Sequence, residues 1–180
     1  MLSIVPDSHP ELFPYVLIEM ALICGMCWVI GPLIVVPARK KAFTFEVMDR
    51  FTEEHQRNFD TKISSIGFPD TGNGKYAQEL SYKDWFHFNN AMRVHYNFVE
   101  QLPSIMVLIF IASLKSPLPT LILAGLYFVF RFIYTIGYVV GGPNLRAIGA
   151  IPILVIKIVL LGYALYTCSC YMSQYSAAKV

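Results

Sequence analysis

Four long runs of apolar residues constrain this chain more than any other feature of its sequence. They cover about residues 13–36, 86–114, 118–140 and 147–172, the second with an amphipathic start. A helix needs about 20 mostly apolar residues to cross roughly 30 Å of hydrocarbon, and each run is long enough. Of the 180 residues, 56% are hydrophobic and only 14% are charged, whereas about a quarter are charged in a typical soluble domain. The sequence therefore predicts an integral membrane protein.

The segments between the runs predict the fold class. Pro117 and Pro119 separate the second run from the third, and Gly141-Gly142-Pro143 separates the third from the fourth. Helix breakers at these places are typical of tight turns between antiparallel helices. We expect an all-α fold in which residues 1–180 form a single domain, a bundle of four transmembrane helices.

The basic residues predict the orientation of these helices. Eight of the fourteen lysines and arginines lie within residues 37–87, and residues 1–36 contain none. Short segments rich in Lys and Arg stay on the cytosolic side of a membrane. We therefore expect the long loop, residues 37–85, and the loop around Arg146 to face the cytosol.

Two polar stripes interrupt the apolar runs near this cytosolic face. They consist of Arg93, Asn97 and Glu100 in the second run, and of Arg131, Tyr134 and Tyr138 in the third. The spacings place each stripe on one side of a helix. Ionisable residues inside membrane spans are costly and often mark a functional cavity. Such a cavity would suit a small zwitterionic molecule with a net negative charge.

A structural explanation of the same residues stays open at this point. Arg93 can pair with Glu100, and Arg131 with Glu19, so that the charges join helices without binding a ligand. Other classes of site have less support. Cys24 and Cys27 form a CxxC pair without the further ligands that a zinc site needs, so we predict no metal. The sequence lacks a basic patch interleaved with aromatic residues, so it does not indicate a nucleic-acid partner.

The polar stripes also carry a resemblance to a known family. The pattern R-x-x-x-N-x-x-E-x-x-P is met by Arg93, Asn97, Glu100 and Pro103, and the pattern R-x-x-Y-x-x-G-Y by Arg131, Tyr134, Gly137 and Tyr138. With the basic run Arg39-Lys40-Lys41 before Ala42-Phe43, these motifs resemble the MAPEG family, membrane-associated proteins in eicosanoid and glutathione metabolism. The likeness is greatest to the microsomal glutathione transferases of the third type.

The resemblance implies a homotrimer that binds glutathione between neighbouring subunits near the cytosolic face. The implied glutathione-binding positions are Arg93, Asn97, Glu100, Arg131, Tyr134, Tyr138 and Lys40. Arg146 falls near the family's thiolate-binding arginine, and Tyr138 is the second residue expected to act in catalysis. The chain departs from the family at Gln101, at Val94 and in its long loop, which leaves the second substrate open.

The activity that follows from the resemblance is that of a glutathione transferase. Glutathione, activated as a thiolate, would attack lipophilic electrophiles that arrive from the membrane lipids, or would reduce lipid hydroperoxides as a glutathione peroxidase. The alternative is a non-catalytic relative that binds lipids or partner proteins, or a structural subunit of a larger membrane complex. The endoplasmic reticulum is the family's usual location, and a mitochondrial membrane is the alternative.

Overall fold

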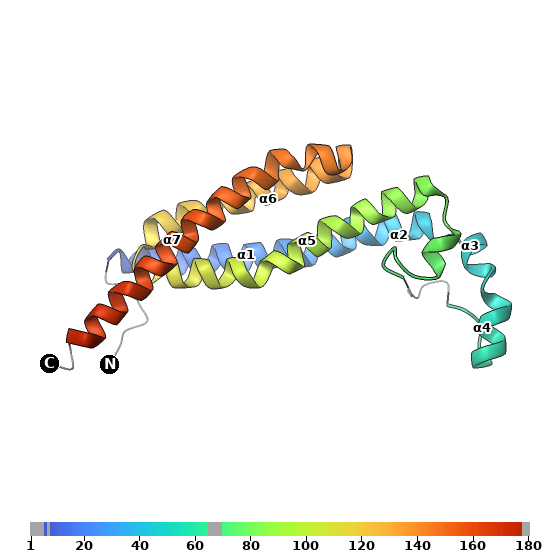
Figure 1. Cartoon of the computed structure of the whole chain (residues 1–180), viewed down its shortest axis with the longest axis horizontal. Coiled ribbons are helices and arrows are strands. Elements are labelled where there is room, and N and C mark those ends of the chain that lie inside the picture. Colours follow the sequence, from blue (N-terminus) through green and yellow to red (C-terminus); the bar gives the residue numbers. More distant parts are fainter. Residues whose placement is uncertain (1–5, 7, 65–69, 178–180) are drawn as a thin grey trace. The chain divides into compact units, whose positions relative to one another are not determined.

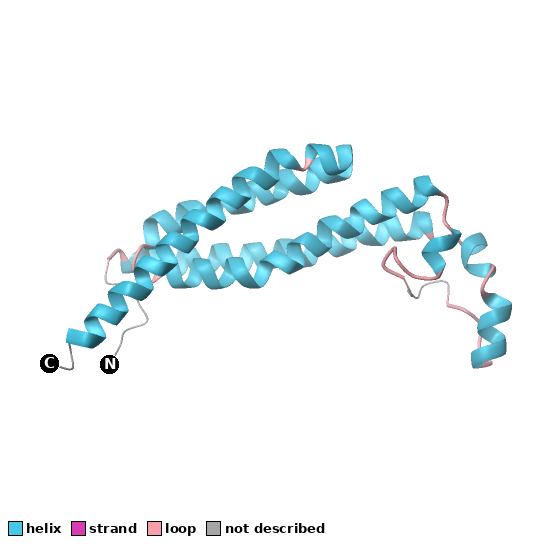
Figure 2. Cartoon of the chain, in the orientation of Figure 1, coloured by secondary structure: helices cyan, strands magenta, loops and turns pink. Residues whose placement is uncertain are grey.

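The computed structural model describes residues 6, 8–64 and 70–177, and in this part of the chain the regular structure is helical, without strands (Figure 2). The chain divides into two compact units. One unit, which we call the hairpin unit, comprises residues Met1–Cys27 and Asn97–Val180. The other, which we call the loop unit, comprises Trp28–Tyr96 and so includes the whole of the predicted cytosolic loop, residues 37–85.

Four helical segments are long and apolar enough to cross a membrane, as predicted. The first runs over Pro10–Ala42 and contains α1 (Phe13–Ile30), a wider π-helical turn at Gly31–Val35, and α2 (Val36–Ala42). The other three are α5 (Tyr82–Ser113), α6 (Pro117–Leu145) and α7 (Ala147–Ala177). The all-α membrane fold predicted from the sequence is confirmed.

The helices extend beyond the apolar runs at several of their ends. Helix α2 continues to Ala42 and so includes the basic run, with Arg39, Lys40 and Lys41 in its last turn. Cations near the carboxyl end of a helix interact favourably with the exposed carbonyl groups there. The basic run therefore forms the last turn of the helix, beyond the apolar residues that the sequence predicted as the span.

The centre of the hairpin unit is the antiparallel pair of α6 and α7, which pack along one another (Figure 1). Buried residues recur every three or four positions on both helices: Thr120, Ala124, Tyr127, Arg131 and Tyr134 on α6, and Gly149, Ile153, Ile156, Leu160 and Ala164 on α7. A Cβ atom on Gly149 would lie 2.5 Å from the backbone nitrogen of Tyr134. Only a glycine allows so close an approach of the two backbones.

The first span packs against α5 within the same unit. The Cys24 thiol lies 3.6 Å from the sulfur of Met106, and the rings of Phe13 and Phe110 have centroids 6.4 Å apart. Large apolar side chains point away from the unit along all its helices; Ile151, for example, is 65% exposed. Hydrocarbon is the natural surrounding of such a surface.

The loop unit has a small apolar core of its own. Ala42, Phe88 and Met92 are buried there, and the ring of Phe43 meets that of Phe88 edge-on at 5.1 Å. The segment between α2 and α5, described from the sequence as a long loop, contains two short helices, α3 (Phe45–Asp49) and α4 (Thr52–Phe59).

Asp70 organises the segment that leads from this region to α5. Its carboxylate accepts hydrogen bonds from the backbone N–H groups of Gly72, Gly74 and Ala77, at 2.7–2.9 Å. The indole N–H of Trp85 then donates to the carbonyl oxygen of Gly72 at 2.8 Å, which ties the turn to the first residues of α5. One buried carboxylate thus satisfies three backbone donors that would otherwise lack partners.

Candidate functional site

The residues predicted to bind glutathione are divided between the two units. Lys40, at the end of α2, and Arg93, on α5, belong to the loop unit, and both side chains are exposed there. The remaining predicted residues belong to the hairpin unit: Asn97, Glu100, Arg131, Tyr134, Tyr138 and Arg146. Five of these six form a connected group, which we call the tyrosine cluster: Asn97, Arg131, Tyr134, Tyr138 and Arg146.

Tyr134 is the centre of the tyrosine cluster. The side-chain amide of Asn97, on α5, donates a hydrogen bond to the Tyr134 hydroxyl oxygen at 2.7 Å. Four residues along α6, the ring of Tyr138 meets that of Tyr134 edge-on, with centroids 5.7 Å apart. Each tyrosine is only 4% exposed. The amide fixes one phenol and the edge-on contact fixes the other, so the two rings have little freedom.

Arg131 lies against the Tyr134 ring and is fully buried. Its guanidinium carbon is 4.2 Å from the ring centre of Phe98 and 4.6 Å from that of Tyr134. Both distances are within the range in which the negative face of an aromatic ring attracts a cation. The positive charge of Arg131 is therefore partly balanced by two ring faces, one from α5 and one from α6.

The break in α6 positions Arg146. Gly142 has φ +64° and ψ −150°, outside the helical region, and a proline follows it. The chain folds back at this point, so that the carbonyl oxygen of Leu145 would be 2.8 Å from a Cβ atom on Gly137. The exposed guanidinium of Arg146 consequently lies 5.5 Å from the ring centre of Tyr138. Arg146 and Tyr138, the two residues predicted to act in catalysis, are neighbours in the structure.

A comparison with protein families identifies the chain. The model of the MAPEG family matches residues 20–166, which is most of the sequence and includes the whole tyrosine cluster. The chain belongs to the MAPEG family. No curated protein and no solved structure is similar enough to this chain to match.

Membership in the MAPEG family confirms the resemblance that the motifs carry. The protein is an integral, multi-pass membrane protein of a family that uses glutathione and acts on lipophilic substrates. The family includes glutathione transferases, and it also has members with other activities and members without catalytic activity. The site residues of this chain decide which of these kinds of member it resembles in function.

Sequence reasoning missed two buried aromatic residues next to the cluster. Phe98 is fully buried and supplies one of the rings over Arg131. Tyr127 is fully buried one helical turn before Arg131, and its hydroxyl has no hydrogen-bond partner among the residues that the structure describes. The signal for Tyr127 was its spacing of four residues from Arg131, but Phe98 could be assigned only from the packing of α5 against α6.

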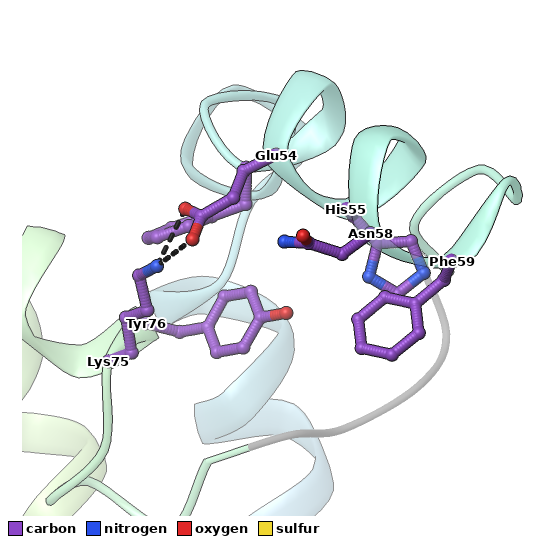
Figure 3. Close-up of a pocket in the computed structure, with 7 residues that line it drawn as sticks. Glu54, His55, Asn58, Phe59, Lys75 and Tyr76 are labelled. Carbon is purple, nitrogen blue, oxygen red and sulfur yellow. Dashed lines mark hydrogen bonds and ion pairs between the residues drawn. The ribbon is translucent and has the colours of Figure 1, made fainter.

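The loop unit contains a separate hollow of about 150 Å³ (Figure 3). Its walls are the side chains of Phe51, Glu54, His55, Asn58, Phe59, Lys75 and Tyr76. The ammonium of Lys75 lies 2.6 Å from a carboxylate oxygen of Glu54, and the rings of Phe51 and Tyr76 have centroids 4.5 Å apart. The ion pair fastens α4 to the segment before α5, and none of the predicted site residues lines this hollow.

Proposed function

We propose that this MAPEG protein is a membrane-bound glutathione transferase. It would activate glutathione as a thiolate that attacks lipophilic electrophiles or reduces lipid hydroperoxides. The observation that carries the proposal is the position of Arg146, whose guanidinium lies 5.5 Å from the Tyr138 ring at one end of the tyrosine cluster. A cation beside fixed phenols is a suitable place for a sulfur atom that gains negative charge.

Residues of the family motifs would bind the rest of glutathione. Lys40, Arg93 and Glu100 are exposed, so their charges are available to the carboxylates and the amine of the peptide. Asn97 and the phenols of Tyr134 and Tyr138 would contact its backbone. Arg131 is fully buried, so we propose that it supports the bound peptide through the Tyr134 ring, over which its guanidinium lies. A homotrimer would complete the site with residues from a neighbouring copy.

The chemistry requires a change in the pKa of the glutathione thiol. A cysteine thiol has an ordinary pKa of about 8.5 and is mostly protonated at neutral pH. Lowering this pKa by about two units takes roughly 2.7 kcal/mol of preferential stabilisation of the thiolate. A guanidinium in a site partly shielded from water can supply a stabilisation of this size. The Tyr138 hydroxyl would donate a hydrogen bond to the same sulfur.

The direction from which each substrate arrives follows from the membrane. Glutathione is polar and would enter from water at the face where Arg146 is exposed. An electrophile that partitions into lipid would reach the sulfur sideways, from the bilayer. We propose the endoplasmic reticulum as the membrane and the microsomal transferases of the third type as the most similar subgroup.

Ultraviolet absorbance of the thiolate tests the proposal directly. Purified protein is titrated with glutathione at neutral pH, and a saturable thiolate signal is expected. Arg146→Ala should raise the pKa of the bound thiol by about two units, which lowers the thiolate fraction at pH 7 about 25-fold. The affinity of the Arg146→Ala variant for S-methylglutathione, which cannot ionise at sulfur, should equal that of the unaltered protein.

Arg57→Ala is the matched control, because it removes an exposed guanidinium from α4. It should leave both the thiolate signal and the affinity intact. Glutathione binding without any thiolate signal in the unaltered protein would instead support a non-catalytic member of the family. A thiolate signal that persists in Arg146→Ala would refute the role of Arg146.

A further inference from the structure

Two opposite charges lie within the membrane spans of the hairpin unit and are not used by the tyrosine cluster. Glu19 on α1 and Lys157 on α7 are each the only charged residue of their apolar run. Both are half-buried. Neither forms an ion pair or a hydrogen bond with any residue that the structure describes.

The two charges lie at the same level along α6. A carboxylate oxygen of Glu19 is 4.0 Å from the place where a Cβ atom on Gly125 would be. On α7, Gly149 lies opposite Tyr134 of α6. Lys157 is eight residues after Gly149, which is about 12 Å along α7, and α7 runs antiparallel to α6. The same distance back along α6 from Tyr134 reaches residue 126, next to Gly125.

This level is inside the hydrocarbon. Gly125 follows the first residue of α6, Pro117, by eight residues, about 12 Å, and precedes the break at Gly142 by seventeen residues, about 25 Å. A hydrocarbon layer of about 30 Å centred on this helix would enclose both side chains. Charged side chains at such a depth are costly unless they meet a partner of opposite charge.

Lipid offers no such partner here, because the charged headgroups lie at the surface of the bilayer. A second copy of the chain does offer one, since each copy has one carboxylate and one ammonium at a matching depth. We propose that Glu19 of one copy forms an ion pair with Lys157 of a neighbouring copy inside the membrane. A closed ring of copies then leaves neither charge without a partner, whatever their number.

The surface around Glu19 has room for an incoming ammonium. Among the described residues, leaving aside the neighbouring residues and backbone of α6 itself, only the Glu19 carboxylate lies within 4 Å of a Cβ atom on Gly125. The neighbouring side chains of Ile122 and Leu126 are 55% and 42% exposed. The carboxylate therefore lies beside an open notch on α6, through which a lysine of another copy can reach it.

Charge reversal tests this contact without any reference to glutathione. Glu19→Lys and Lys157→Glu should each reduce the oligomeric fraction in native mass spectrometry at least tenfold, because like charges would meet in hydrocarbon. The double variant with both changes should recover the oligomer. Glu46→Lys and Lys62→Glu, the same reversals at exposed residues outside the spans, are the controls and should have no effect.

Co-expression then decides whether the pair joins two copies. Glu19→Lys and Lys157→Glu chains with different affinity tags should form mixed complexes in preference to unmixed ones, since the ammonium introduced in one chain then meets the carboxylate introduced in the other. Recovery in the double variant without mixed complexes would place the pair within one chain and overturn the proposal. Unchanged oligomers in both single variants would overturn it as well.

Neutral variants keep the test decisive if a reversal prevents folding. Each single variant, Glu19→Gln or Lys157→Gln, leaves one charge unpaired in the neighbouring copy and should weaken association about tenfold. The double variant with both changes leaves no unpaired charge and should weaken association less than either single variant. Equal association in all three would overturn the proposal. The thiolate signal of glutathione is a separate measurement, so this contact and the proposed activity can fail independently.

Discussion

In the loop unit, several charged side chains meet opposite charges or backbone amides, whereas in the spans of the hairpin unit the buried charge of Arg131 lies over aromatic rings. Glu54 pairs with Lys75, and Arg50 lies 3.2 Å from Glu79. Water screens these exposed pairs, so their contribution to stability is small. Inside a membrane the same groups would be costly, and ring faces replace water as the surrounding of the cation.

The largest effect on this comparison is expected from Arg131. Arg131→Ala removes a fully buried side chain and leaves a cavity beneath Tyr134, which should lower the free energy of unfolding by about 2–5 kcal/mol. Arg131→Met retains most of the volume and should cost less than half as much. Unfolding in mixed detergent micelles, followed by circular dichroism, measures both. Equal losses in the two variants would show that the charge, rather than the packing, stabilises the unit.

An intermediate effect is expected from Asp70. Asp70→Asn removes one carboxylate oxygen that accepts backbone N–H groups and should lower the local stability of the loop unit by about 1–3 kcal/mol. Hydrogen exchange at the amides of Gly72, Gly74 and Ala77 measures this loss. Asp84→Asn, an exposed aspartate in the first turn of α5, is the control and should leave these amides protected.

The same carboxylate predicts a pH dependence. Burial raises the pKa of Asp70, but the backbone N–H groups of Gly74, Ala77, Gly72 and Asn73 together outweigh burial and hold the pKa below its ordinary value of 3.8. A lowered pKa in the folded state contributes stability above the unfolded value, and this stability is lost as the pH falls through the folded value. Protection of the Gly72 amide should therefore decrease below about pH 4. In Asp70→Asn this pH dependence should be absent.

The smallest effect is expected from the ion pair of Glu54 and Lys75. The hydrogen bond from Lys75 lowers the pKa of Glu54, but both side chains are exposed, so solvent screens the interaction. Glu54→Gln should leave the melting temperature unchanged within error at physiological salt. Differential scanning fluorimetry at low and physiological ionic strength measures this. A clear fall in the melting temperature at physiological salt would mean that the ion pair is better shielded from solvent than the exposure of its side chains indicates.

The four spans could be predicted from the sequence because hydropathy reports directly what lipid requires of a helix. The ends of the helices could not, since backbone hydrogen bonds continue through the headgroup region after the apolar residues stop. Helix α2 therefore includes Lys40, and α7 reaches Ala177. The change of direction near Gly142 was predictable, because Gly-Gly-Pro cannot continue a regular helix.

The candidate site could be predicted as a list of residues but not as a set of contacts. Motif spacing selected Asn97, Tyr134 and Tyr138, and the resemblance to the family added Arg146. The structure brings these four residues together. It could not reveal that Arg131 lies over Phe98, because that contact joins two helices whose relative rotation depends on the packing of all their side chains. The alternative that Glu19 pairs with Arg131 was reasonable from charge alone, yet Glu19 forms no ion pair with any described residue.

The close approach of α6 and α7 at Gly149 also bears on how the protein is made. Helices enter the membrane in the order of their synthesis, and a chain folds from its N-terminal part onward. Phe98 is therefore made before Arg131, and Tyr134 follows within one turn. Helix α7 can pack against α6 only after the break at Gly142 has been made. A side chain at position 149 would meet the backbone of α6. We therefore expect a larger residue there to disturb first the docking of α7 on α6 while the protein is being made.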